Sequence, residues 1–455
     1  MRFLGLDVHR DFCEVAIVEE SQLRLAGRVL STRAALELFG QSLAPDDVVA
    51  MEATANALAI ARIIEPHVAR VVLANPKAVK AATGLRAKTD KIDARTLARL
   101  LAAGFLAEVW TPDEQTRVRR RLISRRGHLV RQQVREKNQV HAVLQRQLKD
   151  RPPMTDLFGV KGRAWLAAQR ERLPLDEQQS VDACVRQIDF VKAEIELVDR
   201  EIAKQVMANA DIRRLMTLPG VSGVTATALL AAIGDVSRFA TPNHLVGYLG
   251  LSPRVRQSGS EPAKHGRISK QGPGAVRGLL VEAAWHAART TGPLRAFHQR
   301  VKARRGANIA TVAVARKLVV IAWNMLSRGE DYAFARPSLH REKLRRFELI
   351  LGAERQQGKC LSSAGRTFAT IDQRKAEKEL AAQAETAYHR LMADWQPAKK
   401  KAGVGATPGR ASQKPSTGKA ARQTQQPQGL LFAPSVTHTH ETHPRKEGPH
   451  RPDQT

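Results

Sequence analysis

Two apolar, strand-like runs in the first part of the chain each end in a single acidic residue. The first run ends in Asp7 and the second in Glu52. A carboxylate at such a position is costly to bury unless a partner or a metal ion compensates its charge. Farther along, Asp90 and Asp93 stand three residues apart at the start of a helix-like stretch, so they share one helix face. We therefore expect these four carboxylates to form one pocket for divalent cations.

The charge of the chain indicates what this pocket acts on. The 455 residues carry a formal net charge of +30, which favours a polyanionic partner, and nucleic acid over a membrane. The hydrophobic fraction of 43% is enough for true cores, and the length predicts two or three domains. A carboxylate cation site in a nucleic-acid-binding protein indicates phosphodiester chemistry.

Cysteine spacing and hydropathy indicate the cellular compartment in which the protein works. Cys13, Cys184 and Cys360 are widely spaced and lack zinc-site spacing, so neither a disulfide framework nor a structural zinc site is predicted. This pattern fits a reducing cytoplasm. The chain opens in a strand-like run rather than a signal peptide, and the apolar stretch 312–325 is interrupted by two basic residues. We expect no membrane span.

The first domain, residues 1–112, alternates strand-like and helix-like patterns. Strands are predicted at 3–6, 13–18, 23–29, 48–51 and 68–74, and helices at 34–42, 55–64 and 93–103. The first two strands form a hairpin with His9 in its turn. Three hairpin-like strands followed by alternating strand and helix predict an α/β domain of the ribonuclease H type.

The remaining chain divides into four predicted regions. Residues 113–210 form a basic, heptad-bearing helical linker, and residues 211–335 a mostly α-helical C-terminal domain. A helical extension covers 336–395. Residues 396–455 are rich in Pro, Gly, Gln and Ser and are predicted to be a disordered basic tail, because they cannot bury enough apolar surface to fold.

The linker carries two patterns. Between Arg117 and Arg135 the helical stretch is rich in arginine and has few nearby acids, which indicates a surface for nucleic-acid backbones. A heptad seam follows, made of Cys184, Ile188, Val191, Ile195, Val198 and Ile202. It predicts an antiparallel helix pairing within one chain or between two. The alternative is an ordinary amphipathic helix.

The C-terminal domain opens with an apolar-Pro-Gly turn, residues 218–226, that resembles a helix-hairpin-helix motif. In that motif, glycines let backbone N–H groups approach a phosphate; the alternative is a plain helix–helix turn. Serines among arginines and glycines follow in 248–260 and 265–272. A serine hydroxyl can attack a phosphodiester when cations stabilise the charge. Composition alone fits a passive phosphate-contacting loop better, so it identifies no nucleophile.

These motifs together resemble one family. Residues 3–8, 51–54 and 88–94 resemble the N-terminal motifs of the DEDD transposases of insertion sequences, which are recombinases related to the Piv DNA invertase and guided by a bridge RNA. The second half resembles the C-terminal transposase domain of the same family at 218–221, 234–239, 248–253, 257–259 and 266–272. The resemblance covers about residues 1 to 330.

The resemblance implies a RuvC-like first domain and a serine nucleophile. The implied ligands of Mg²⁺, with Mn²⁺ as a substitute, are Asp7, Glu52, Asp90 and Asp93. The family's serine joins covalently to DNA, and the residue that matches it is Ser258, with Ser260 and Ser269 as rivals. The resemblance also implies homo-oligomers with composite sites, and a noncoding guide RNA that pairs with donor and target DNA.

Other functions are compatible with parts of the pattern. A RuvC-like metal-dependent nuclease or junction resolvase would use the same acids with water and form no covalent intermediate. A noncatalytic RNA-binding or DNA-architectural protein would keep the acids only for structure. An actin-like kinase shares the start around Asp7, but it needs glycine-rich phosphate loops that we do not find in the sequence.

Overall fold

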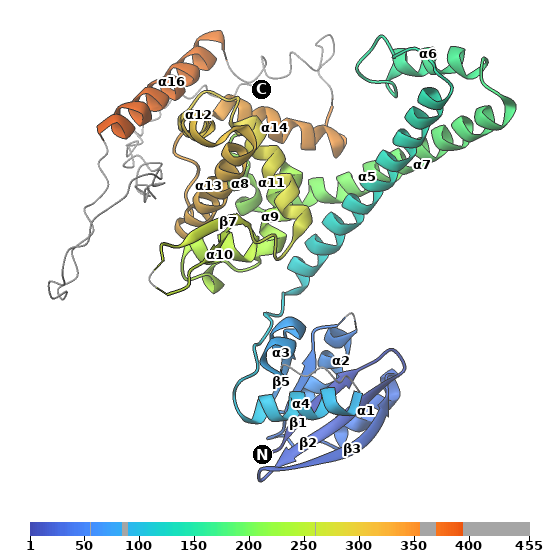
Figure 1. Cartoon of the computed structure of the whole chain (residues 1–455), viewed down its shortest axis with the longest axis vertical. Helices are drawn as coiled ribbons and strands as arrows, with labels where there is room; N and C mark the ends of the chain where they lie inside the picture. Colours follow the sequence, from blue (N-terminus) through green and yellow to red (C-terminus); the bar gives the residue numbers. More distant parts are fainter. Residues whose placement is uncertain (55, 84–89, 260, 355–369, 395–455) are drawn as a thin grey trace, which may run out of the picture. The chain divides into compact units, whose positions relative to one another are not determined.

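The computed structural model describes residues 1–54, 56–83, 90–259, 261–354 and 370–394, and the chain divides into two compact units, Met1–Asp113 and Glu114–Thr455 (Figure 1). The first unit is a mixed α/β sheet domain, and the second is mostly helical. The elements of the first unit are β1 (Phe3–Val8), β2 (Phe12–Glu19), β3 (Gln22–Leu30), α1 (Arg33–Gln41), β4 (Val48–Glu52), α2 (Ala57–Ile64), η1 (Glu65–His67), β5 (Arg70–Ala74), α3 (Pro76–Thr83) and α4 (Asp90–Ala102).

The first unit is organised around a five-stranded sheet in the order β3-β2-β1-β4-β5. The first three strands pair antiparallel, and Asp7 lies opposite Glu14 in the β1–β2 ladder. β4 runs parallel to β1, with Leu6 opposite Met51, and β5 runs parallel to β4. Parallel neighbours require crossover connections, which α1 and α2 supply. The carboxyl ends of β1 and β4 therefore meet at one edge.

Helices cover both faces of this sheet. Because successive side chains of a strand point to opposite faces, Leu4 and Leu6 pack with Ile60 of α2 in one apolar core. The other face carries Gly5 and Asp7, and α4 lies against it through Ala94 and other small residues. The helix that bears two of the predicted acids therefore covers the strand that bears a third.

The turn after β5 follows local capping rules. β5 ends at Ala74, and the side-chain oxygen of Asn75 accepts a hydrogen bond of 3.0 Å from the backbone N–H of Lys77. Pro76 is the first residue of α3, where the missing proline N–H costs nothing. The predicted end of this strand at residue 74 is confirmed.

The second unit contains two long helices and a helical core. Its elements are α5 (Glu114–Arg146), α6 (Val160–Arg170), α7 (Leu175–Ala208), α8 (Ala210–Leu215), α9 (Gly223–Ile233), η2 (Val236–Arg238), α10 (Pro242–Tyr248), β6 (Pro253–Arg256), β7 (Lys264–Ile268), α11 (Gly274–Ala287), α12 (Pro293–Arg305), α13 (Ala307–Arg328), α14 (Pro337–Ile350) and α16 (Ile371–Asp394). The predicted tail at 396–455 lies outside the described residues, and so does Cys360.

Arginines of α5 are tied to α7, which corrects the expectation of a free cationic surface. The ion pairs along the two helices are Arg125–Glu194 (2.7 Å), Arg126–Asp199 (2.6 Å) and Arg146–Glu177 (2.8 Å). Their reversed order shows that α5 and α7 run antiparallel. The sequence has few acids near these arginines, and the fold supplies acids from α7. Arg131 and Arg135 form no ion pair with any residue in the described ranges.

The heptad seam of α7 is used inside the chain. Ile188, Val191 and Ile202 are fully buried. Val191 and Ile202 belong to the main core of the second unit, whereas Ile188 is buried at another point along α7. The sequence left open whether this seam pairs within a chain or between chains; these side chains pack within their own chain. Of the two alternatives, the structure therefore shows the pairing within one chain.

The most apolar long helix, α13, lies in the centre of the second unit. It is long and apolar enough to cross a membrane by length and composition, which corrects the expectation that no stretch qualifies. Its side chains Val314, Leu318 and Met325 are buried in the main core. Core packing therefore accounts for its apolar composition.

The glycines of the predicted helix-hairpin-helix turn serve close packing. Gly220 has a φ of +78°, and a Cβ at this position would lie 2.1 Å from the carbonyl oxygen of Ala283 in α11. A Cβ at Gly223 would lie 2.4 Å from the ring of Phe347 in α14. The turn joins α8 to α9, as the sequence indicates. Its glycines, however, lie against α11 and α14 of the same unit, so their lack of a side chain serves packing between helices.

Candidate active site

The carboxyl ends of two neighbouring strands bring the first two predicted acids together. Asp7 is the penultimate residue of β1, and Glu52 is the last residue of β4. The parallel register places Leu6 opposite Met51, so the residues that follow them, Asp7 and Glu52, lie side by side at this edge of the sheet. Both are partly buried. Ends of parallel strands are where open α/β sheets bind their ligands.

Helix α4 brings the other two acids over the same edge. Asp90 and Asp93 both lie in its first turn, where the helix dipole favours negative charge. The helix can approach because β1 has Gly5 beneath it: a Cβ there would lie 2.2 Å from the carbonyl oxygen of Ala94. Gly5 and Asp7 face the same side of β1, so this close contact sets the distance between α4 and Asp7.

A histidine bridges acids from the strand and the helix. The Nε2 atom of His9 lies 3.0 Å from Oδ2 of Asp7 and 3.2 Å from Oδ1 of Asp90. One ligand atom from each of these three residues lies within 4.8 Å of the others, as a shared cation requires. The His9 ring also stacks on Phe12, with ring centroids 5.0 Å apart. The cluster therefore has a fixed aromatic wall.

The electrostatics of this cluster disfavour negative charge on Asp7 while no cation is bound. Burial raises the pKa of Asp7, and the charges of Asp93 and Asp90 raise it further, whereas His9 opposes the shift. The side chain of Asp7 is only 15% exposed. Repulsion among converging acids in a partly buried site is relieved by a divalent cation, and carboxylate oxygens are the ligands that Mg²⁺ prefers.

In the sequence, Lys88 and Lys91 lie beside the Asp90 and Asp93 pair, where their charges would attract a phosphate backbone. Lys88 lies outside the described residues, and the side chain of Lys91 is outside the described set as well.

The candidate serines belong to a β-hairpin in the second unit. Ser258 is exposed in the connection between β6 and β7. Ser269 follows β7 at the base of the hairpin, where its Oγ lies 3.5 Å from the backbone N–H of Gln271. Ser260 lies outside the described residues. Of the two described candidates, only Ser258 presents its hydroxyl at an exposed position away from the base.

The base of this hairpin is tightly packed. A Cβ on Gly250 would lie 2.1 Å from the carbonyl oxygen of Gln271, and one on Gly272 would lie 2.0 Å from that of Tyr248. Both glycines have positive φ angles, +71° and +75°. Arg277 donates hydrogen bonds to carbonyl oxygens on both sides of this contact. Two sequence motifs from separate segments of the chain therefore form one rigid platform under the hairpin.

Comparisons with known proteins match both halves of the chain. Residues 4–148 match a family model for the DEDD transposases of IS110 elements, whose description is "Transposase". A second model, described as the transposase IS116/IS110/IS902 family, matches residues 212–299. The y4qE protein of Sinorhizobium fredii, named as a transposase, is 30% identical over 289 residues, which cover 62% of this chain and 71% of that protein. The chain belongs to the IS110 family of transposases.

Two further relatives of this transposase show the range of the family. The transposase for insertion sequence element IS1328 of Yersinia enterocolitica is 27% identical over 303 residues, covering 64% of this chain and 86% of that protein. The pilin gene-inverting protein of Moraxella bovis is 26% identical over 278 residues, covering 58% and 75%. The resemblance inferred from the motifs is confirmed, and the transposase is an enzyme that cuts and rejoins DNA.

Sequence reasoning misses His9, which belongs to the acidic cluster of this transposase, and Glu14, a buried acid beside the cluster. His9 is predicted only as part of a turn, although a residue two positions after Asp7 on an extended segment faces the same side. Glu14 is an acid within an apolar strand, only 2% exposed, directly opposite Asp7 in the sheet. The Nε atom of Arg28 compensates it at 2.7 Å. The signal for Glu14 is the same one that identifies Asp7.

Proposed function

We propose that this transposase cleaves DNA by attack of the Ser258 hydroxyl, assisted by a divalent cation held by Asp7, Glu52, Asp90 and Asp93, and then rejoins the strand to a new partner. The single observation that carries the proposal is the meeting of strand and helix acids around His9 at one sheet edge. The order of the sheet, antiparallel at first and then parallel, supports a RuvC-like domain of the ribonuclease H type.

The donor set fits Mg²⁺, with Mn²⁺ as a substitute. The acids supply hard oxygen ligands, and burial together with their mutual repulsion raises the pKa of Asp7 in the absence of a cation. A bound cation would neutralise the charge that develops on the phosphate oxygens during strand cleavage. His9 would hold Asp7 and Asp90 at the spacing that the cation requires, because its Nε2 contacts both carboxylates.

The hairpin residues would carry the covalent step. The oxygen of Ser258 forms a bond to phosphorus as the bond from phosphorus to the departing nucleoside oxygen breaks, and the serine proton leaves while the departing oxygen gains one. The resulting phosphoserine bond keeps the energy of the broken phosphodiester for rejoining. The exposed side chains of Arg254, Arg256 and Lys264 on β6 and β7 would attract the DNA backbone.

The family resemblance extends the proposal to partners. A structured noncoding RNA would pair with donor and target DNA and so select the sites, while the protein binds backbones through its net charge of +30. The acids and the serine belong to different compact units, which suits a composite site in a homo-oligomer, with the serine of one subunit serving the acids of another. Such a transposase would work in the cytoplasm next to the bacterial nucleoid.

The decisive experiment is to trap the protein–DNA adduct. The full chain is incubated with Mg²⁺, its guide RNA and a plasmid that carries the element with its flanking DNA, and DNA linked to protein is measured after denaturation. Ser258→Ala should abolish the adduct, because no other hydroxyl replaces the attacking oxygen. Ser269→Ala, a matched change at the hairpin base, should retain it.

Other outcomes would redirect the assignment. An adduct that survives Ser258→Ala would move the nucleophile to Ser260 or Ser269. Cleavage that proceeds in wild type without any adduct would support the water-dependent nuclease or resolvase instead.

A further inference from the structure

Helix α16 contacts the second unit through two glutamates on one of its faces. It packs against both α12 and α14 (Figure 1). Glu377 and Glu385 are eight residues apart, with buried Ala381 between them. At 1.5 Å per residue their Cα atoms are separated by about 12 Å along the helix axis. Each carboxylate reaches the start of a different helix.

Glu385 occupies the N-terminus of α12. Its Oε2 accepts a hydrogen bond of 3.0 Å from the backbone N–H of Gly292, the residue that precedes the helix. Arg295, in the first turn, donates to the same carboxylate from Nε at 2.9 Å and from Nη2 at 2.8 Å. Glu385 is only 8% exposed. A backbone donor, a helix N-terminus and a guanidinium thus converge on one buried anion.

Glu377 occupies the N-terminus of α14 in the same way. Its Oε1 accepts a hydrogen bond of 2.9 Å from the backbone N–H of Ser338, and its Oε2 accepts one from the Ser338 hydroxyl. The Nε atom of Arg336, the residue before the helix, lies 3.9 Å from Oε2. This is a second cradle with the same three kinds of group as the first.

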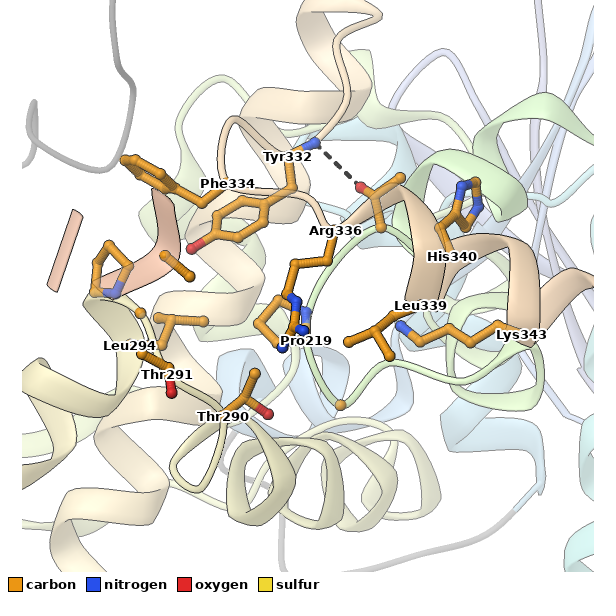
Figure 2. A pocket seen from close by; sticks show the side chains of 15 residues that line it. Pro219, Thr290, Thr291, Leu294, Tyr332, Phe334, Arg336, Leu339, His340 and Lys343 are labelled. Carbon is orange, nitrogen blue, oxygen red and sulfur yellow. Dashed lines mark hydrogen bonds between the residues drawn. The ribbon is translucent and has the colours of Figure 1, made fainter. Parts of the chain in front are cut away.

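A small pocket adjoins these cradles. It has a volume of about 80 Å³ and is lined by residues that include Thr290, Thr291, Arg336 and His340 (Figure 2). The buried Nε of Arg336 and Nε2 of His340 have no hydrogen-bond partner among the described residues. For Arg336 the Glu377 carboxylate at 3.9 Å supplies the opposite charge but is too far for a hydrogen bond, so this cradle leaves room for a closer acceptor.

The contact of α16 combines its two glutamates with one partly buried aromatic side chain, Tyr388, which packs against the main core of the second unit. In the described part of the helix only Ala381 and Glu385 are buried, while Ile371 and Leu380 are 77% and 65% exposed. The apolar surface exposed to water if the helix left would be that of Ala381 and of partly buried side chains such as Tyr388, which is small for a helix of this length. An anion of another molecule can therefore compete for its place.

Backbone N–H groups at a helix N-terminus together with an arginine form a typical site for a phosphate group. We propose that α16 is a releasable strap whose Glu377 and Glu385 carboxylates occupy two phosphate positions, and that the phosphodiester backbone of a nucleic acid displaces them. The Cα atoms of the two glutamates are about 12 Å apart along α16, a spacing that one nucleic-acid backbone covers within a few nucleotides. This inference is independent of the metal site and of Ser258.

The test compares two double variants of the full chain with the same change in charge. Glu377→Gln with Glu385→Gln weakens the strap but retains an oxygen that can cap each helix. Asp372→Asn with Glu379→Gln alters two exposed acids of the same helix that make no hydrogen bond or ion pair with the described residues. Affinity is measured for a labelled mixed-sequence DNA duplex of about 30 base pairs, long enough to span both phosphate positions, and for the RNA duplex of the same sequence.

The strap variant should bind both duplexes about tenfold more tightly than the control variant, since the intramolecular competitor is weakened. Adding Arg295→Gln to the strap variant should remove this gain. Equal affinities of strap and control variants, or a gain that survives Arg295→Gln, would overturn the proposal. A gain with only one duplex would identify that nucleic acid as the occupant.

Hydrogen exchange provides a second readout on the wild-type chain. If the backbone displaces the strap, adding the duplex should speed amide exchange in residues 371–394. Unchanged or slower exchange in this segment would show that α16 stays in place and would contradict the proposal.

Discussion

The acidic cluster of the first unit and the serine hairpin of the second are built in opposite ways. The cluster draws its residues from separate segments that the sheet and α4 hold together, and His9 contacts two of its acids. In the hairpin, the rigid part is the base around Gly250 and Gly272, and Ser258 stands exposed beyond it. Its hydroxyl makes no hydrogen bond with the described residues.

This difference follows from the physics of the groups. Converging carboxylates repel one another, so the fold has to hold them in place, and packing at Gly5 does so. A serine hydroxyl is uncharged and costs little to leave in water. In the proposed mechanism the hydroxyl also has to reach a phosphate of the DNA substrate, so it has to be accessible. A pre-positioned acidic cluster and an exposed serine are therefore the arrangement that the proposed cleavage mechanism requires.

The largest effect is expected from Asp7→Asn. DNA cleavage should fall about a hundred- to a thousandfold, because a metal ligand worth several kcal/mol of charge stabilisation is lost. Thermal stability without metal should not fall, since burial already raises the pKa of Asp7 and so disfavours its charged form in the fold. The rise in melting temperature on adding Mg²⁺ should disappear. Thermal unfolding with and without Mg²⁺ measures both.

The matched control is Asp11→Asn, because Asp11 is 87% exposed and lies in the turn that follows β1. It should retain cleavage and the response to Mg²⁺. If Asp7→Asn kept either property, the acidic cluster would not be the cation site, and the comparison with the hairpin would lose its basis.

Much of the acidic site can be predicted, because strand alternation and helix spacing are local. Asp7, Glu52 and the pair in α4 follow from apolar runs and from a three-residue spacing. The sequence cannot show that Gly5 sets the approach of α4, since that contact joins segments almost ninety residues apart. Glu14 is an acid within an apolar strand, as Asp7 is, but only the register of the β1–β2 pair shows that the two lie opposite each other.

For the arginines of α5, the sequence suggests unpaired charge where the fold forms ion pairs. The sequence has few acids near Arg125 and Arg126, which suggests free positive charge. Their partners, Glu194 and Asp199, lie about seventy residues away and reach them only because α7 folds back along α5. Charge counted over a sequence window predicts net charge well, but it does not predict which charges the fold pairs.

A second prediction tests the packing that positions the acids. Gly5→Ala should place a methyl group against the carbonyl oxygen of Ala94 and push α4 away, at a cost of about 2–3 kcal/mol. The free energy of opening of α4, measured by hydrogen exchange, should fall by this amount, and Mg²⁺ affinity should fall with it. Gly266→Ala is the control: this strand glycine of β7 has its nearest neighbouring atom at 3.7 Å. Equal effects of both changes would refute the role of Gly5.

The smallest expected effect is a difference in stability between a substitution at the tip of the hairpin and one at its base. Gly259 has a φ of +54°, and a Cβ added there would meet no atom of the described residues within 4 Å. Gly259→Ala should therefore cost only the strain of a left-handed residue, about 1–2 kcal/mol. Gly272→Ala adds a steric clash with the carbonyl oxygen of Tyr248, for about 1–3 kcal/mol more. Thermal unfolding of the two variants measures the difference. If Gly259→Ala were less stable than Gly272→Ala, the tip would be more tightly packed than the base. The description of an exposed serine on a rigid base would then be wrong for this hairpin.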